Sequence, residues 1–256
     1  MTPTQYLNSI LSKYTTLPTL LLQLSPTYHA VVPRLRTWGY PVIREIKISG
    51  SNAKGTAIAG DVDLDLFISL DPSVLSTHTL TSIYDSLVKG VQNAGYVARR
   101  QSVSVRINHV GMEVDIVPGV KFAGNTNDHW LHVTKSGRDR TKTNIDTHIN
   151  RVVNSGRVGE IRLVKIWRKL NNLDFPSIYL EETVINCLSG YRIGNLETNF
   201  LRVMDFLSGS FANTTVIDPA NSSNVISDDL TVVEKNVIGY TASISKAQPT
   251  WGTIVW

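Results

Sequence analysis

Two acidic residues separated by one leucine, Asp63 and Asp65, follow a glycine–serine pair, Gly50–Ser51. Side chains at positions i and i+2 of a strand share one face, so the two carboxylates are expected to point together. Carboxylates on one face repel each other and are stabilised by a divalent cation. A glycine–serine turn at a helix start can present backbone N–H groups to a phosphate. This combination suits the transfer of a nucleotidyl group.

A third carboxylate is expected, because two clustered cations need more negative ligands than one acidic pair provides. The segment 112–118, Met-Glu-Val-Asp-Ile-Val-Pro, offers Asp115. If this segment is a strand beside the first acidic strand, Asp115 faces the acidic pair while Val114 and Ile116 face the core. Asp115 would then bind metal and could accept the proton of an attacking hydroxyl. Glu113 shares its face.

Two alternative interpretations compete at the front motif. An acidic pair can simply be solvated on an edge strand, and this is the preferred interpretation of a bare pair without a glycine–serine turn. Residues 50–56, Gly-Ser-Asn-Ala-Lys-Gly-Thr, also have the two glycines of a P-loop. Thr56 stands where a P-loop has its lysine, so a P-loop ATPase is not expected.

Basic residues further along the chain offer phosphate contacts. In the segment 160–171, apolar residues recur at helical spacing, and Lys165 lies on a different face. Lys165 could bind a triphosphate as a point charge or belong to a solvated helix face, and its spacing favours neither. The loop 134–142 could clamp phosphates or an acceptor nucleic acid, or could be merely soluble. His129 and His132 lack partners for a metal site.

The overall composition sets bounds on the class of protein. The chain has 256 residues, 42% of them hydrophobic, which indicates a globular protein with one large domain or two small ones. A net charge of +4 suits a protein that handles polyanions such as nucleoside triphosphates. The single cysteine, Cys187, excludes an internal disulfide and favours a reducing cytoplasm. No apolar run is long enough to span a bilayer, and no leader is recognised.

The pattern of elements predicts an α+β fold in two domains. Residues 1–143 would form the catalytic domain, with N-terminal helices and a small mixed sheet covered by helices. Within it, residues 119–143 are expected to be loop. Residues 144–256 would form a helical domain that closes a nucleotide cleft between the two.

The front motif resembles that of the DNA polymerase β-type nucleotidyltransferase superfamily. The match comprises Gly50–Ser51, Lys54–Gly55–Thr56 and the acidic run 60–65, in the same order and spacing. It resembles in particular the branch of archaeal CCA-adding enzymes, 2′-5′-oligoadenylate synthases and cGAS/DncV-like nucleotidyltransferases (CD-NTases). The resemblance continues at Glu113–Pro118 and covers roughly residues 40–235. It implies a polymerase β-like nucleotidyltransferase domain.

Looser matches follow in the second half of the chain. The segments 143–148, 162–167 and 176–182 resemble the family's segments with a histidine near the nucleotide, a lysine on the triphosphate and a Ser/Tyr pair. Val216–Pro219, with Asn224 after it, resembles a late Asp-Pro element. The residues implied to bind the nucleotide are Gly50, Ser51, Lys54, Thr56, His148, Lys165, Ser177 and Tyr179.

The resemblance implies two Mg²⁺ ions, or Mn²⁺, held by Asp63, Asp65 and Asp115. It also has departures: Asp146 stands where a proline is common, and the tail and arm domains with which CCA-adding enzymes grip tRNA are expected to be missing. A compact enzyme that joins free nucleotides is therefore favoured over a tRNA enzyme.

Three functions remain open on this basis. The leading one is template-independent synthesis of a cyclic or linear oligonucleotide second messenger from nucleoside triphosphates, as in antiphage signalling. The second is nucleotide addition to an RNA 3′ end or transfer of a nucleotide to a protein, which needs an RNA or protein partner. The third is an inactive nucleotide-binding module, and the presence of all three carboxylates argues against it.

Overall fold

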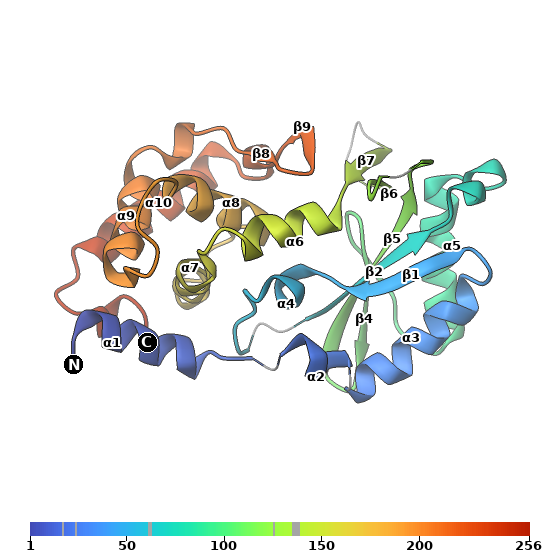
Figure 1. Ribbon diagram of the computed structural model, residues 1–256, viewed down its shortest axis with the longest axis horizontal. Coiled ribbons are helices and arrows are strands. Elements are labelled where there is room, and N and C mark those ends of the chain that lie inside the picture. The colour runs from blue at the N-terminus through green and yellow to red at the C-terminus, as the bar shows by residue number, and fades with distance from the viewer. Residues whose placement is uncertain (17, 24, 61–62, 125, 135–138) are drawn as a thin grey trace. The chain divides into compact units, whose positions relative to one another are not determined.

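The computed structural model describes residues 1–16, 18–23, 25–60, 63–124, 126–134 and 139–256 (Figure 1). The chain divides into two compact units. The first, called here the sheet unit, comprises residues 17–55 and 61–149. The second, the helical unit, comprises residues 1–16, 56–60 and 150–256.

In the described part of the sheet unit, seven strands form one mixed sheet. The strands are β1 (Ile43–Ile48), β2 (Leu64–Leu70), β3 (Arg99–Arg100), β4 (Val105–His109), β5 (Met112–Lys121), β6 (His129–His132) and β7 (Arg140–Thr143). Their order is β1-β2-β5-β4-β3, with β6 pairing with β5 and β7 with β6. Strands β2 and β5 are parallel, and the other pairs are antiparallel.

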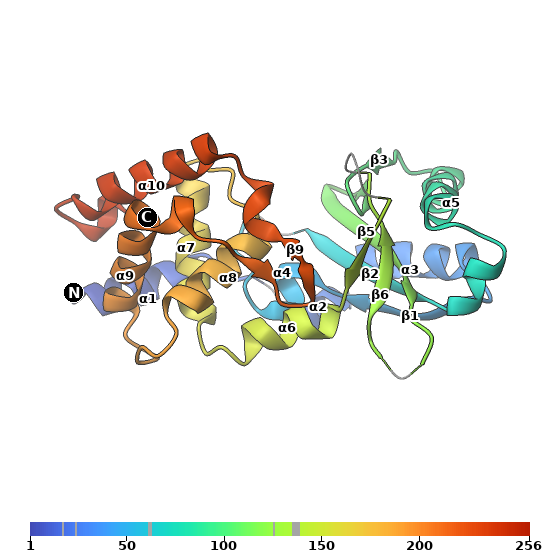
Figure 2. The ribbon, with the colours of Figure 1, turned by 90° about the horizontal axis from the view of Figure 1, so that it is seen from above.

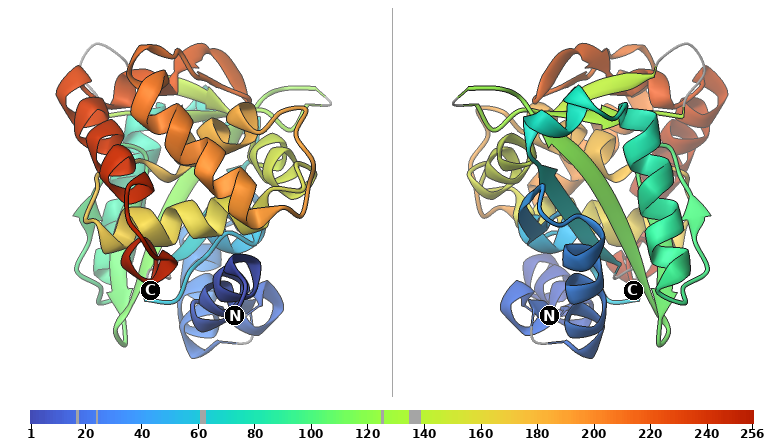
Figure 3. Two further views of the ribbon diagram at one scale, coloured as in Figure 1. Left: turned by 90° about the vertical axis from the view of Figure 1, so that its left-hand side faces the viewer. Right: turned by 90° about the vertical axis from the view of Figure 1, so that its right-hand side faces the viewer.

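Helices cover one face of this sheet. They are α2 (Thr19–Gln23), α3 (Pro26–Trp38) and α5 (Leu80–Asn93), while the short α4 (Gly50–Lys54) follows β1. Figure 3 shows α3 and α5 side by side on the same face of the sheet, and the two helices contact each other. Alternate residues of β2, among them Leu64 and Leu66, are fully buried in the core beneath these helices. The remaining β2 residues face the other side, because side chains alternate along a strand.

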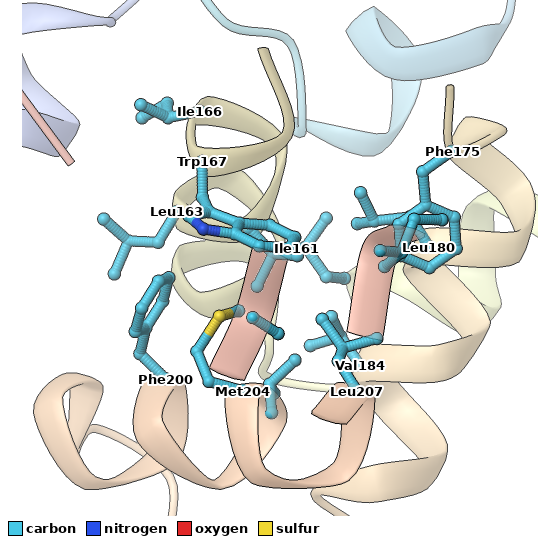
Figure 4. Close-up of a cluster of buried hydrophobic side chains, with 14 of the residues drawn as sticks. Ile161, Leu163, Ile166, Trp167, Phe175, Leu180, Val184, Phe200, Met204 and Leu207 are labelled. Atoms are coloured by element: carbon cyan, nitrogen blue, oxygen red, sulfur yellow. The ribbon is translucent and has the colours of Figure 1, made fainter. Parts of the chain in front are cut away.

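The helical unit holds a second hydrophobic core. Its elements are α1 (Pro3–Lys13), the second part of α6 (Ile145–Val153), α7 (Val158–Leu170), α8 (Ser177–Cys187), α9 (Leu196–Gly209), α10 (Val232–Lys246) and the hairpin β8 (Ile217–Asp218) and β9 (Asn221–Val225). Trp167, Phe200 and Met204 are fully buried in this core, where they lie close together (Figure 4). The indole nitrogen of Trp167 donates to Ser245 Oγ at 2.8 Å, so the buried ring keeps a polar partner.

The two units differ in their bounds from the division predicted at residue 143. Residues 1–16 and 56–60 belong to the helical unit, and residues 144–149 belong to the sheet unit. The packing of α1 explains the first difference, because Leu7 and Ile10 are buried in the core of the helical unit. The boundary falls inside α6 (yellow-green in Figure 2), which runs unbroken from residue 145 to 153.

The prediction of a loop over residues 119–143 is wrong. Strand β5 continues to Lys121, and β6 and β7 follow. Both added strands are short, and β7 is polar and partly exposed. Strand β6 pairs with the far end of β5, and β7 pairs with β6. This pairing stabilises their extended conformation, and a local sequence pattern does not reveal it. Within the described residues, the structure has no helix long and apolar enough to cross a membrane.

Candidate active site

The parallel pairing of β2 with β5 places Asp65 directly opposite Asp115. The neighbouring residues Leu64, Val114 and Ile116 are fully buried on the helix-covered face. The two acids therefore lie on the opposite face, as the alternation along each strand requires. The predicted pairing of the two acidic strands is confirmed, and Asp63, Asp65 and Asp115 are called the carboxylate cluster below.

An arginine that sequence reasoning missed binds two members of this cluster. Arg106 lies on β4 directly opposite Asp115. Its Nε is 2.8 Å from Asp115 Oδ1, and its Nη2 is 2.6 Å from Asp115 Oδ2 and 3.0 Å from Asp63 Oδ2. Its Nη1 donates to Glu113. The hydrogen bond to Asp115 raises the pKa of Arg106 above its usual range, so the group keeps its positive charge. The sequence feature that could have indicated Arg106 is its position between Val105 and Ile107, two apolar residues of one strand.

Two hydrogen bonds connect the glycine–serine turn to Asp63 and Asp65. The Ser49 N–H donates to the Asp65 carbonyl at 2.8 Å, and the Asn52 side-chain amide donates to the Asp63 carbonyl at 2.7 Å. Gly50 has a φ of +58° at the start of α4. A Cβ on Gly50 would lie 1.8 Å from Asp65 Oδ2, so only glycine fits beside this carboxylate. Asn52 was the second residue that sequence reasoning missed.

The carboxylate cluster fits a divalent cation in its chemistry. Its ligand atoms are hard carboxylate oxygens, which Mg²⁺ and Mn²⁺ prefer. Asp63 and Asp115 already share one cationic group, the guanidinium of Arg106, between them. In the arrangement described, no group of three or more His, Cys, Asp or Glu side chains among the described residues is positioned as a ready-made metal site.

Lys165 and Thr56 lie together in the helical unit. Lys165 Nζ is 2.7 Å from Glu181 Oε1 and 2.9 Å from Thr56 Oγ1. The Thr56 hydroxyl in turn donates to Glu181 Oε1 at 2.9 Å. Lys165 is only 2% exposed, which excludes the alternative of a solvated helix face. An ion pair holds it because a buried ammonium without a partner would be strongly disfavoured.

Residues 56–60, which follow the turn, are attached to the same unit. Ala57 and Ile58 are buried, and the Ala59 N–H donates to the Tyr14 carbonyl at 3.0 Å. Lys169 on α7 donates to the carbonyls of Ala59 and Gly60. Lys54, at the end of α4 in the sheet unit, is buried as well. These contacts give residues 56–60 a fixed conformation.

The three remaining predicted nucleotide contacts occupy different surroundings. His148 is half-buried on the part of α6 that belongs to the sheet unit. Ser177 begins α8, and its hydroxyl accepts a hydrogen bond from Arg168 Nη1 at 3.1 Å. Tyr179 is fully buried, and its ring stacks on Phe211 with the centroids 5.1 Å apart. Burial raises the pKa of Tyr179 to about 12. The structure thus places Tyr179 in the core of the helical unit.

The histidines discounted as metal ligands have other partners. His129 Nε2 lies 2.7 Å from Ser69 Oγ, and its Nδ1 lies 2.9 Å from the Asn127 carbonyl. His132 Nδ1 lies 3.3 Å from the hydroxyl of Thr81. Of the basic loop 134–142, residues 135–138 lie outside the described residues, and its end forms β7.

Comparison with known sequences gives a distant relative. No family model matches the chain. A CCA-adding enzyme of Halobacterium salinarum is 27% identical over 220 residues, which cover 81% of this chain and 45% of that protein. The chain therefore spans less than half the length of the curated relative that it matches.

Comparison with solved structures gives the fold. The CD-NTase CdnG of Bradyrhizobium diazoefficiens, in complex with GTP, superimposes with a TM-score of 0.74 at 14% identity over 96% of this chain and 90% of that chain. The CdnE cyclic dinucleotide synthase of Elizabethkingia meningoseptica, with GTP and Apcpp, gives a TM-score of 0.73 at 11% identity over 97% and 100%. The chain has the fold of these nucleotidyltransferases, and the fold implied by the front motif is confirmed.

Proposed function

We propose that this chain is a template-independent nucleotidyltransferase that uses nucleoside triphosphates and releases pyrophosphate. The observation that carries the proposal is the placement of Asp65 opposite Asp115 and against Gly50, in a fold shared with nucleotidyltransferases. The pairing of β2 with β5 joins two acidic segments that are far apart in the sequence. The acids of β2 and β5 and the glycine–serine turn at the start of α4 provide separate places for cations and phosphates.

Asp63, Asp65 and Asp115 would hold the divalent cations, proposed as two Mg²⁺ ions or Mn²⁺. When bound, the cations supply charge neutralisation at the phosphates. The proposed phosphate contacts of this chain are the backbone of Gly50 and Ser51. The further proposed nucleotide contacts are Lys54, Thr56, His148, Lys165, Ser177 and Tyr179.

The chemistry proposed is an in-line displacement at the α-phosphate. A ribose hydroxyl attacks the α-phosphorus, the bond from the α-phosphorus to the bridging oxygen breaks, and pyrophosphate leaves. Asp115, at the centre of the cluster, would accept the proton of the attacking hydroxyl. Its side chain is only 13% exposed, which limits competition from water for that proton.

The product proposed is a cyclic or linear oligonucleotide messenger of the kind used in antiphage signalling. The similar CdnE structure is named as a cyclic dinucleotide synthase, which supports this product. The second candidate is nucleotide addition to an RNA 3′ end or to a protein. The similarity to a CCA-adding enzyme supports addition to RNA. That similarity extends over 45% of the enzyme.

The test is to incubate the purified protein with the four nucleoside triphosphates and Mg²⁺ or Mn²⁺, separate the products by chromatography and identify them by mass spectrometry. Asp63→Ala/Asp65→Ala is the inactive control. An oligonucleotide formed by the wild type alone supports messenger synthesis. Product that forms only after RNA or a cell lysate is added supports the second candidate. Nucleotide binding without consumption under all these conditions contradicts both.

A further inference from the structure

Arg106 connects three carboxylates in the sheet unit. Its guanidinium contacts both oxygens of Asp115, one oxygen of Asp63 and one oxygen of Glu113. The side chains are partly buried, with exposed fractions of 25% for Arg106 and 13% for Asp115. Charge-assisted contacts of this kind are stronger than those in open solvent, because the screening by water is reduced.

Three carboxylates surround the single guanidinium of Arg106. Glu113 and Asp115 lie on β5, Asp63 lies just before β2, and all three carboxylates contact the guanidinium of Arg106. Acids this close together would repel each other if the guanidinium were removed. Arg106 therefore stabilises the metal-free arrangement.

The oxygens that Arg106 contacts are the oxygens that a cation would need. Both oxygens of Asp115 and Oδ2 of Asp63 accept hydrogen bonds from the guanidinium. An ion placed between these two carboxylates would meet a like charge at contact distance. We propose that Arg106 is an internal counter-ion that occupies the carboxylate cluster and competes with the divalent cation, so that cation entry displaces its guanidinium. This inference rests on the proposed function, which assigns Asp63 and Asp115 as metal ligands.

Glu113 gives the displaced guanidinium an alternative partner. It lies two residues before Asp115 on the same face of β5, and it accepts from Nη1 of Arg106 rather than from the nitrogens that contact Asp115. The guanidinium can thus leave Asp63 and Asp115 while it keeps one ion pair. Arg99 Nη1 also lies 3.7 Å from Glu113. Glu113 therefore forms ion pairs with two arginines, Arg99 and Arg106.

The test measures Mn²⁺ binding directly, by electron paramagnetic resonance of the free ion, without nucleotide or turnover. Arg106→Gln keeps hydrogen-bond donors but removes the charge, and it should bind Mn²⁺ about tenfold more tightly than the wild type. Arg106→Lys keeps the charge and should bind more weakly than Arg106→Gln. Arg100→Gln removes one positive charge from the ion pair with Asp85, outside the cluster, and should leave Mn²⁺ binding unchanged.

A second measurement uses thermal unfolding with and without Mn²⁺. Metal-free Arg106→Gln should unfold at a lower temperature than the wild type, and Mn²⁺ should raise its midpoint by more. Equal or weaker Mn²⁺ binding by Arg106→Gln, with binding abolished in Asp63→Ala/Asp65→Ala, would overturn the role of Arg106 alone. Unchanged binding in Asp63→Ala/Asp65→Ala would overturn the metal site itself, and with it this part of the proposed function.

Discussion

Gly50 and Asp65 are in such close contact that a Cβ on the glycine would lie 1.8 Å from the carboxylate oxygen Oδ2. Gly50 also has a φ of +58°, a conformation that other residues adopt at a cost of about 1–2 kcal/mol. Glycine is therefore required at position 50 for two reasons: the positive φ of the turn, and the lack of space for a Cβ beside Asp65. The contact places the glycine–serine pair directly beside the acidic motif.

The double requirement at Gly50 can be separated by substitution. Gly50→Ala should destabilise the protein through its backbone strain and should also displace Asp65, so that Mn²⁺ binding and nucleotide turnover fall by about tenfold or more. Gly95→Ala is the matched control, because Gly95 has a φ of +89° but open space around its Cα. It should lower the unfolding midpoint without changing turnover. Equal losses of turnover in the two variants would contradict the contact with Asp65.

The buried ion pair of Lys165 and Glu181 predicts a strong coupling in stability. Lys165→Met leaves the Glu181 carboxylate buried without its ammonium partner, so the free energy of unfolding should fall by about 3–5 kcal/mol. The double variant Lys165→Met/Glu181→Leu should recover most of this loss. Urea denaturation of the two single variants and the double variant measures the coupling as a double-mutant cycle.

The same double variant tests the proposed nucleotide contact of Lys165. If its stability recovers while turnover stays low and the KM for nucleoside triphosphate rises, Lys165 acts on the nucleotide as well. Full recovery of turnover together with stability would restrict Lys165 to a structural role.

His129 predicts a loss of stability in mild acid. Burial holds the pKa of His129 below its usual value, and its ring nitrogens are engaged by Ser69 and the Asn127 carbonyl. The unfolded chain therefore takes up a proton at His129 at a higher pH than the folded protein does. The free energy of unfolding should decrease as the pH falls through about 6.5, and the decrease should level off below the folded pKa.

Urea denaturation between about pH 8 and pH 5 measures this effect. His129→Gln should lower the slope of stability against pH, whereas the exposed His78→Gln should keep the wild-type slope. A wild-type slope in His129→Gln would contradict the assignment.

The main features of the candidate site could be predicted because strand alternation is a local rule. The side chains of Asp63, Asp65 and Asp115 follow period two along strands whose intervening residues are apolar, so their face could be read from the sequence. The pairing of β2 with β5 was expected from the need for a third acid, and the structure confirms it.

Other features depend on partners that are far apart in the sequence. Arg106 is significant only because the register of β4 and β5 places it opposite Asp115. Strand β6 forms by pairing with β5, and β7 forms by pairing with β6, while their own residues give a weak signal. The burial of Tyr179 depends on packing against Phe211, which helical periodicity alone does not determine.

If the three carboxylates support nucleotidyl transfer, the reaction should depend on the negative charge of Asp115, which Asp115→Asn removes. The substitution keeps the shape of the side chain but removes the negative charge and the proton acceptor. Wild-type protein and the variant would be incubated with α-labelled nucleoside triphosphates and Mg²⁺, with and without cell RNA and lysate, and pyrophosphate and labelled product would be measured. Wild-type protein should form product, and Asp115→Asn should form it at a rate at least about 100-fold lower. Equal rates in the two folded proteins would contradict this dependence.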